Sequence, residues 1–84
     1  MSDSDENAPD VEAIHKALGE RENIRQVGLG EGIVGVSVYD VSKVDVGAIK
    51  AAGATKVERH GPTDNFGITV GPHAKMVAYW LERF

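Results

Sequence analysis

Apolar residues recur along this chain with two spacings, one typical of helices and one typical of strands. Helical spacing appears first near the N-terminus, at Val11, Ile14 and Leu18. Asn7 or Asp10 is available as the N-cap of this segment, and Gly19 as its terminator. The pattern predicts a short amphipathic helix that begins at about residue 11.

Alternation of apolar and polar positions predicts strands in the central and later parts of the chain. Residues 23–29 show a moderate strand signal. Residues 34–39 show a stronger one, because every second residue is valine. Residues 66–70 alternate again, and 55–59 form a short polar segment typical of an edge strand. The stretch 60–65 between the last two is dense in turn-forming residues.

Two further helices are predicted. Ser42 followed by Asp45 resembles a capping box, and an apolar face made of Val44, Ala48 and Ala51 or Ala52 follows it as far as Gly53. Pro72 suits the first turn of a last helix, where its missing N–H is harmless. The apolar stripe of that helix, which we expect to lie in the core, is Val77, Trp80, Leu81 and Phe84.

The resulting order is helix, strand, strand, helix, strand, strand, helix. Each strand has one apolar face, so the sheet should be largely antiparallel, with helices on one side and water on the other. The predicted fold class is therefore α+β: a two-layer sandwich in which a four-stranded, mainly antiparallel sheet carries three helices on one face.

Composition narrows the possible functions. The 84 residues fit one domain, which we place at residues 10–84, preceded by a disordered acidic tail at residues 1–9. Thirteen acidic against nine basic residues give a formal charge of −4, with no basic cluster to bind nucleic acid. Cysteine is absent, which excludes thiol chemistry. We expect a cytoplasmic monomer without membrane insertion, since no segment suits a signal peptide or a membrane span.

Residues 30–35 spell G-x-G-x-x-G, the fingerprint of dinucleotide sites. That motif works because a helix N-terminus follows it, and here a predicted strand follows instead. The favoured interpretation is a flexible or tightly turned loop whose glycines allow positive φ.

Histidines and carboxylates have ordinary explanations in this sequence. We expect His15 to lie on the polar side of the first helix, and Asp40 and Asp45 to be helix caps rather than a catalytic pair. His15, His60 and His73 are expected to be ordinary surface residues, and His60 with Asp64 and His73 is the one combination worth testing for metal. No metal or cofactor is predicted.

Several segments together resemble the IIB domain of the glucose-type sugar phosphotransferase system. These segments are 22–24, 36–38, 40–45, Gly53 and 70–74, so the resemblance spans roughly residues 11 to 84. It implies a four-stranded antiparallel sheet with three helices on one face. It also implies a loop between the first two strands in which a cysteine takes a phosphoryl group from a IIA histidine and passes it to the sugar held by the membrane IIC domain.

This chain is a divergent case of that resemblance, because the active-site residues are missing. By ungapped counting the family's phosphocysteine falls on Gly30, and the two arginines that hold the phosphate fall on Ile33 and Gly35. A glutamine common before the last strand of the family corresponds to Gly67. Glycine offers no nucleophile, and neither Ile33 nor Gly35 supplies charge, so cysteinyl phosphotransfer is excluded at this loop.

The sequence thus predicts a IIB-like domain that has lost phosphotransfer and acts as a non-catalytic interaction or regulatory module, with a IIA or IIC component or a regulator as partner. The predicted binding residues are Gly28, Gly30, Glu31, Gly32, Ile33 and Gly35. Backbone amides of three of these glycines form a candidate anion nest, which the charge of Glu31 opposes. Two alternatives stay open: phosphate carried on His60, Ser37 or Thr63, or a small apolar or neutral ligand on the same scaffold.

Overall fold

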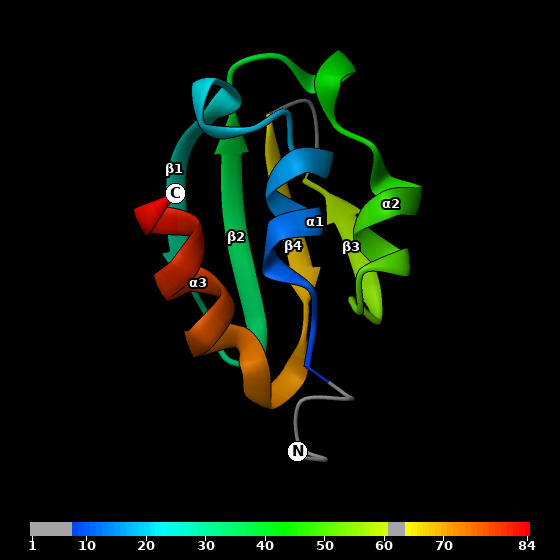
Figure 1. The fold of residues 1–84 in the computed structure, drawn as a ribbon, viewed down its shortest axis with the longest axis vertical. Helices are drawn as coiled ribbons and strands as arrows, with labels where there is room; N and C mark the ends of the chain where they lie inside the picture. The colour runs from blue at the N-terminus through cyan, green and yellow to red at the C-terminus, as the bar shows by residue number, and fades with distance from the viewer. Residues whose placement is uncertain (1–7, 61–63) are drawn as a thin grey trace.

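The computed structural model describes residues 8–60 and 64–84, and it shows a sheet with helices packed against it (Figure 1). The elements follow the predicted order. The strands are β1 (Ile24–Leu29), β2 (Ile33–Val38), β3 (Lys56–Arg59) and β4 (Asn65–Thr69). The helices are α1 (Val11–Ala17), α2 (Val46–Ala51) and α3 (Ala74–Arg83), with short 3-10 turns η2 (Arg21–Asn23), η3 (Val41–Lys43) and η4 (Gly71–His73).

The sheet is antiparallel throughout, in the order β1-β2-β4-β3. Figure 1 shows α1, α2 and α3 on the same side of it, which confirms the predicted α+β architecture. None of the helices in the described residues is long and apolar enough to span a membrane.

The core lies between this sheet face and the helices. Val34, Val36 and Val38 of β2 are each at most 1% exposed, as their alternation predicted. Ile68 of β4 lies beside them on the same sheet face, and the large side chains that the helical layer and its ends contribute are chiefly Ile14, Leu18, Ile49, Val77 and Leu81. Burial of branched aliphatic side chains from both layers is the main favourable contribution to folding.

One buried amide closes the core at the end of β2. Asn23 is 3% exposed, and its Nδ2 donates to the backbone oxygens of Leu18, at 2.8 Å, and Asp40, at 2.9 Å. Its Oδ1 accepts from the Asp40 N–H at 2.7 Å. Asn23 therefore ties the end of α1 to the end of β2, a role that its place before a strand did not reveal.

Aspartates cap α1 and α2, as expected, but α2 begins later than the sequence suggested. The Asp10 carboxylate accepts from Ala13 N–H, and the Asp45 carboxylate accepts from Ala48 N–H. Ser42 is therefore not the cap of a capping box; it lies in η3, where its backbone and hydroxyl both donate to Asp40. The prediction failed because the 3-10 turn already satisfies the Ser42 donors before α2 starts at Val46.

The last helix faces the sheet differently from the prediction. Its buried residues are Ala74, Val77, Ala78 and Leu81, whereas Trp80 is 47% and Phe84 38% exposed. The two aromatic residues are thus not core residues, because two alanines form the sheet-facing stripe and turn Trp80 to the flank. There Trp80 packs edge-on against Tyr79 at 5.3 Å between ring centroids, and Arg83 lies over the Tyr79 ring.

Candidate functional site: the glycine hairpin and the open sheet face

The glycine-rich segment forms the turn between β1 and β2. Gly30 N–H donates to the Ile33 carbonyl at 2.7 Å, which closes the hairpin. Gly32 adopts φ +74, and its carbonyl accepts from the amides of Val70 and Gly71, each at 3.0 Å. The hairpin is therefore fixed to the connection between β4 and η4, and the positive φ explains why glycine is found at position 32.

Dinucleotide binding finds no support in this geometry. Gly35, the last glycine of the fingerprint, lies inside β2, so no helix N-terminus follows the motif. The candidate anion nest is not formed either, because its amides do not converge as free donors. Gly28 belongs to β1 opposite Gly35, and the Gly30 amide is bonded within the turn.

Three glycines lie side by side across the face of the sheet that the helices leave open. Gly28 of β1 pairs with Gly35 of β2, which pairs with Gly67 of β4. At Gly35 an added Cβ would meet no atom within 4 Å, whereas at Gly67 it would lie 2.9 Å from the Nε2 of His60. The His60 ring therefore covers Gly67, and the surface over Gly28 and Gly35 is bare main chain.

Polar side chains border this bare surface and make it a hollow of about 340 Å³. Gln26, Ser37 and Asn65 form the next row across β1, β2 and β4, and the Ser37 hydroxyl donates to the Asn65 Oδ1. His60 lies at the other side, and among the described residues that line the hollow there is no carboxylate, lysine or arginine. Amide, hydroxyl and imidazole groups over a glycine floor are suited to hydrogen-bonding a neutral, flat ligand.

The predicted binding residues divide between two neighbouring places. Gly28 and Gly35 line the hollow, while Gly30, Glu31 and Gly32 form the hairpin tip beyond it. Ile33, at the start of β2, is 42% exposed on the open face, where one of its methyl carbons would lie 3.6 Å from a Cβ at Gly67.

Sequence inspection missed Gln26 and Asn65, because they meet only through the pairing of β1, β2 and β4. In the sequence each of them stands next to a core residue of its own strand, and this alternation was the signal that could have placed them on the open face.

The histidine candidates do not form a metal site. Within residues 8–60 and 64–84 no three His, Cys, Asp or Glu side chains are grouped closely enough to hold a metal ion. His60 and Asp64 lie near the start of β4, whereas His73 follows the far end of that strand, so the length of β4 separates His73 from the other two.

His15 is not an ordinary surface residue of α1. Its ring lies 4.5 Å from that of Phe84, and its Nε2 is buried without a hydrogen-bond partner among the described residues. The prediction was wrong because α3 ends over this side of α1.

Asp40 is a capping residue with a perturbed titration. Hydrogen bonds from the Ser42 hydroxyl, at 2.6 Å, and from the Ser42 amide, at 3.0 Å, lower the pKa of its carboxyl below the ordinary value. Asp40 is exposed and lies beyond the end of β2. These contacts account for its behaviour without any catalytic role.

The class that this architecture defines is a small α+β two-layer sandwich with one open sheet face. In comparisons with known proteins, no family model matches the chain and no curated protein matches it. Its function therefore has to be argued from the hairpin and the open face.

Proposed function

We propose that this protein is a IIB-like domain that has lost cysteinyl phosphotransfer and acts as a non-catalytic interaction module for components of sugar transport. The proposal joins the sequence resemblance to the architecture described above. A four-stranded antiparallel sheet with three helices on one face is what that resemblance implies.

The observation that carries the proposal is the tip of the β1-β2 hairpin. The position matched to the phosphorylated cysteine is Gly30, which has no side chain and whose amide is bonded to Ile33. The positions matched to the phosphate-holding arginines are Ile33 and Gly35, which present an alkyl group and bare main chain on the open face. A phosphoryl group would find neither a nucleophile nor positive charge there.

The partner surface in this proposal is the hairpin with the adjoining open face, made by Gly28, Gly30, Glu31, Gly32, Ile33 and Gly35. Ile33 supplies an exposed apolar contact, and Glu31 a single charge at the tip. A IIA-type protein, a IIC-type permease or a regulator that meets an active IIB domain is the expected partner.

Two measurements test this proposal. We expect isotope-labelled protein mixed with a IIA-type protein to show NMR shift changes confined to residues 28–36, and Glu31→Lys to alter them.

After incubation with phosphoenolpyruvate and the phosphorelay proteins, we expect mass spectrometry to give the mass of the unmodified protein. The triple variant Gly30→Cys, Ile33→Arg, Gly35→Arg restores the matched groups and should acquire a phosphoryl group. A triple variant that folds but stays unlabelled would show that these positions are wrongly matched.

The mass measurement also tests phosphate transfer through another acceptor. The Ser37 hydroxyl donates a hydrogen bond to Asn65 Oδ1, an amide oxygen that cannot act as a strong base. His60 lies over Gly67, and Thr63 lies outside the described residues. A phosphorylated wild-type protein whose label is lost in His60→Ala would favour this alternative.

The hollow favours a second candidate function, the binding of a small neutral ligand. Its lining is uncharged, and its floor is main chain. We expect a neutral ligand of this class to raise the melting temperature of the wild-type protein. Gly35→Val, which would fill the floor, should abolish that rise, and Lys50→Ala on α2 should leave it unchanged.

A further inference from the structure

The two outer strands of the sheet present their free edges very differently. Gly30, directly after β1, and Ile33 of β2 form a hydrogen-bonded pair. Along an antiparallel pair of strands, hydrogen-bonded and non-hydrogen-bonded residue pairs alternate. Val27 and Leu29 are therefore non-bonded positions opposite β2, and their N–H and C=O groups point to the free edge. Over residues 26–29 this edge carries no charged side chain.

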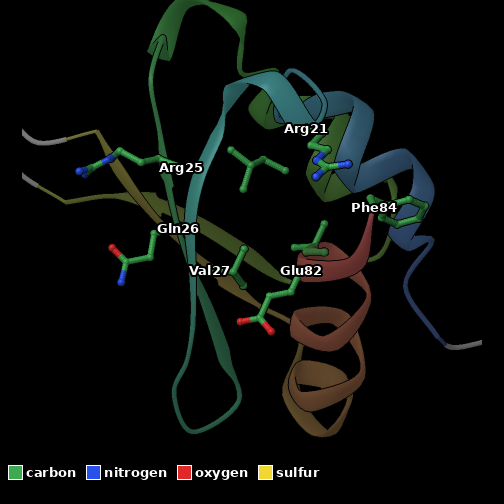
Figure 2. A pocket seen from close by; sticks show the side chains of 8 residues that line it. Arg21, Arg25, Gln26, Val27, Glu82 and Phe84 are labelled. Atoms are coloured by element: carbon green, nitrogen blue, oxygen red, sulfur yellow. The ribbon is translucent and has the colours of Figure 1, made fainter.

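A groove runs beside this edge, between β1 and the C-terminal half of α3. It has a volume of about 200 Å³, and the apolar side chains of Ile24, Val27, Leu81 and Phe84 line it together with Arg21, Arg25, Gln26 and Glu82. Figure 2 shows Val27 directed from β1 toward α3, with Arg25 and Gln26 on the opposite side of the strand. The groove therefore opens where the core reaches the edge of the sheet.

Two arginines, Arg21 and Arg25, contribute positive charge to the groove. Both residues are exposed, and within residues 8–60 and 64–84 neither guanidinium group makes an ion pair or hydrogen bond. On the opposite edge, in contrast, Lys56 of β3 is paired with Glu58 at 3.0 Å. Two unpaired guanidinium groups in a chain of net charge −4 are suited to carboxylates of a partner.

We propose that the β1 edge binds an extended acidic segment of a partner protein, which adds to the sheet as a fifth strand. Its main chain would pair with Val27 and Leu29, as in other complexes formed by strand addition. Because side chains alternate along a strand, apolar residues on one face would enter the groove while carboxylates on the other reach Arg25. Arg21, at the end of the groove, would hold a further carboxylate.

This occupant is favoured over two others by charge. Nucleic acid binds to an extended basic surface, whereas this groove has two arginines, Arg21 and Arg25, beside Glu82. A second copy paired edge to edge would bring two arginine-bearing strands together. The surface lies at the edge of β1 rather than at the hairpin tip, so this inference goes beyond the proposed function and does not depend on it.

The test uses the full chain and three blocked seven-residue peptides. One alternates Glu and Val with Glu at both ends, and the others carry Gln or Lys in place of Glu. We expect only the Glu peptide to bind, measured by fluorescence anisotropy of a labelled peptide at low salt. Added salt should weaken it, because exposed ion pairs are screened. In NMR spectra the amides of Val27 and Leu29 should shift most.

Two variants and a matched control sharpen the test. Arg21→Glu with Arg25→Glu should weaken binding roughly tenfold or more, since attraction becomes repulsion. Lys50→Glu with Lys75→Glu makes the same change in net charge on exposed sites that do not line the groove, and should alter affinity less than about threefold. Leu29→Pro removes an N–H directed away from β2 and should abolish binding while the melting transition is retained.

Several results would overturn the proposal. Equal binding of the Glu and Lys peptides would remove the charge argument. Shifts confined to the glycine hairpin would place the peptide elsewhere. A concentration-dependent dimer that blocks the Glu peptide and is lost in Leu29→Pro would assign the edge to a second copy. If Leu29→Pro unfolds, the arginine variants and the three peptides still decide the outcome.

Discussion

The two faces of the sheet are built from the same strands but serve different ends. In β2, Val34, Val36 and Val38 point to the helices and are fully buried, while Gly35 and Ser37 between them face the open side. Such a division is possible because successive side chains of a strand point to opposite faces. Burial of apolar side chains on the covered face therefore contributes most of the favourable free energy of folding, and substitutions on the open face should affect stability less.

The bare surface of the open face follows from the register of the strands. Three glycines come side by side only because Gly28, Gly35 and Gly67 are opposite each other in adjacent strands. Glycine weakens a strand through its conformational freedom, so three in one row cost stability. Burial of the β2 valines on the covered face offsets this cost.

Truncation at matched isoleucines should produce the largest difference between the two faces. Ile68 of β4 is fully buried, so Ile68→Ala should lower the free energy of unfolding by about 2–5 kcal/mol. Ile33→Ala on the open face should lower it by less than about 1 kcal/mol, because Ile33 is already half exposed. Urea denaturation followed by circular dichroism measures both changes. Similar losses at the two sites would contradict the assignment of the core to one face.

A second pair of variants compares two amide side chains. Asn23→Ala should cost about 2–3 kcal/mol, because it leaves the buried Leu18 carbonyl and the part-buried backbone groups of Asp40 without partners. Asn65→Ala removes one hydrogen bond to Ser37 at a half-buried site, and we expect a loss of about 1 kcal/mol or less. The same denaturation series gives both values, and a larger loss at Asn65 would reverse the comparison.

The covered face was predictable from local sequence, and the open face was not. Valine alternation in β2 and aspartate caps depend on neighbours within a few residues, so element order and fold class followed directly. Trp80 and Phe84 were wrongly placed in the core, since helical spacing alone does not show which flank of a stripe meets the sheet. The hollow needed the register of three strands, which no segment specifies alone.

Replacing glycine by alanine at two positions of the open face should give a smaller difference in the free energy of unfolding. Gly67→Ala forces the His60 ring to move, because the new Cβ would lie 2.9 Å from Nε2 at the end of an exposed side chain, and we expect a loss of at most about 1 kcal/mol. Gly35→Ala meets no atom and should be neutral or stabilising by about 0.5–1 kcal/mol. In a His60→Ala background the Gly67→Ala loss should shrink. Persistence of the full loss there would mean that His60 is not the obstacle.

The smallest effect on stability is expected at Asp40, which lies beyond the end of β2 and belongs to neither face of the sheet. Hydrogen bonds from Ser42 hold the pKa of this carboxyl below its ordinary value in the folded state. The stabilisation is therefore fully present above the ordinary pKa and is lost as the pH falls through the lowered one.

Ser42→Ala removes the hydroxyl donor and should bring the pKa of Asp40 back toward its ordinary value, which NMR titration of the carboxyl carbon measures directly. The melting temperatures of wild type and Ser42→Ala should then differ most above the ordinary pKa and converge in acid. If the titration of Asp40 is unchanged in Ser42→Ala, the amide of residue 42 alone holds the carboxylate, and η3 would be stabilised by its backbone rather than by the serine side chain.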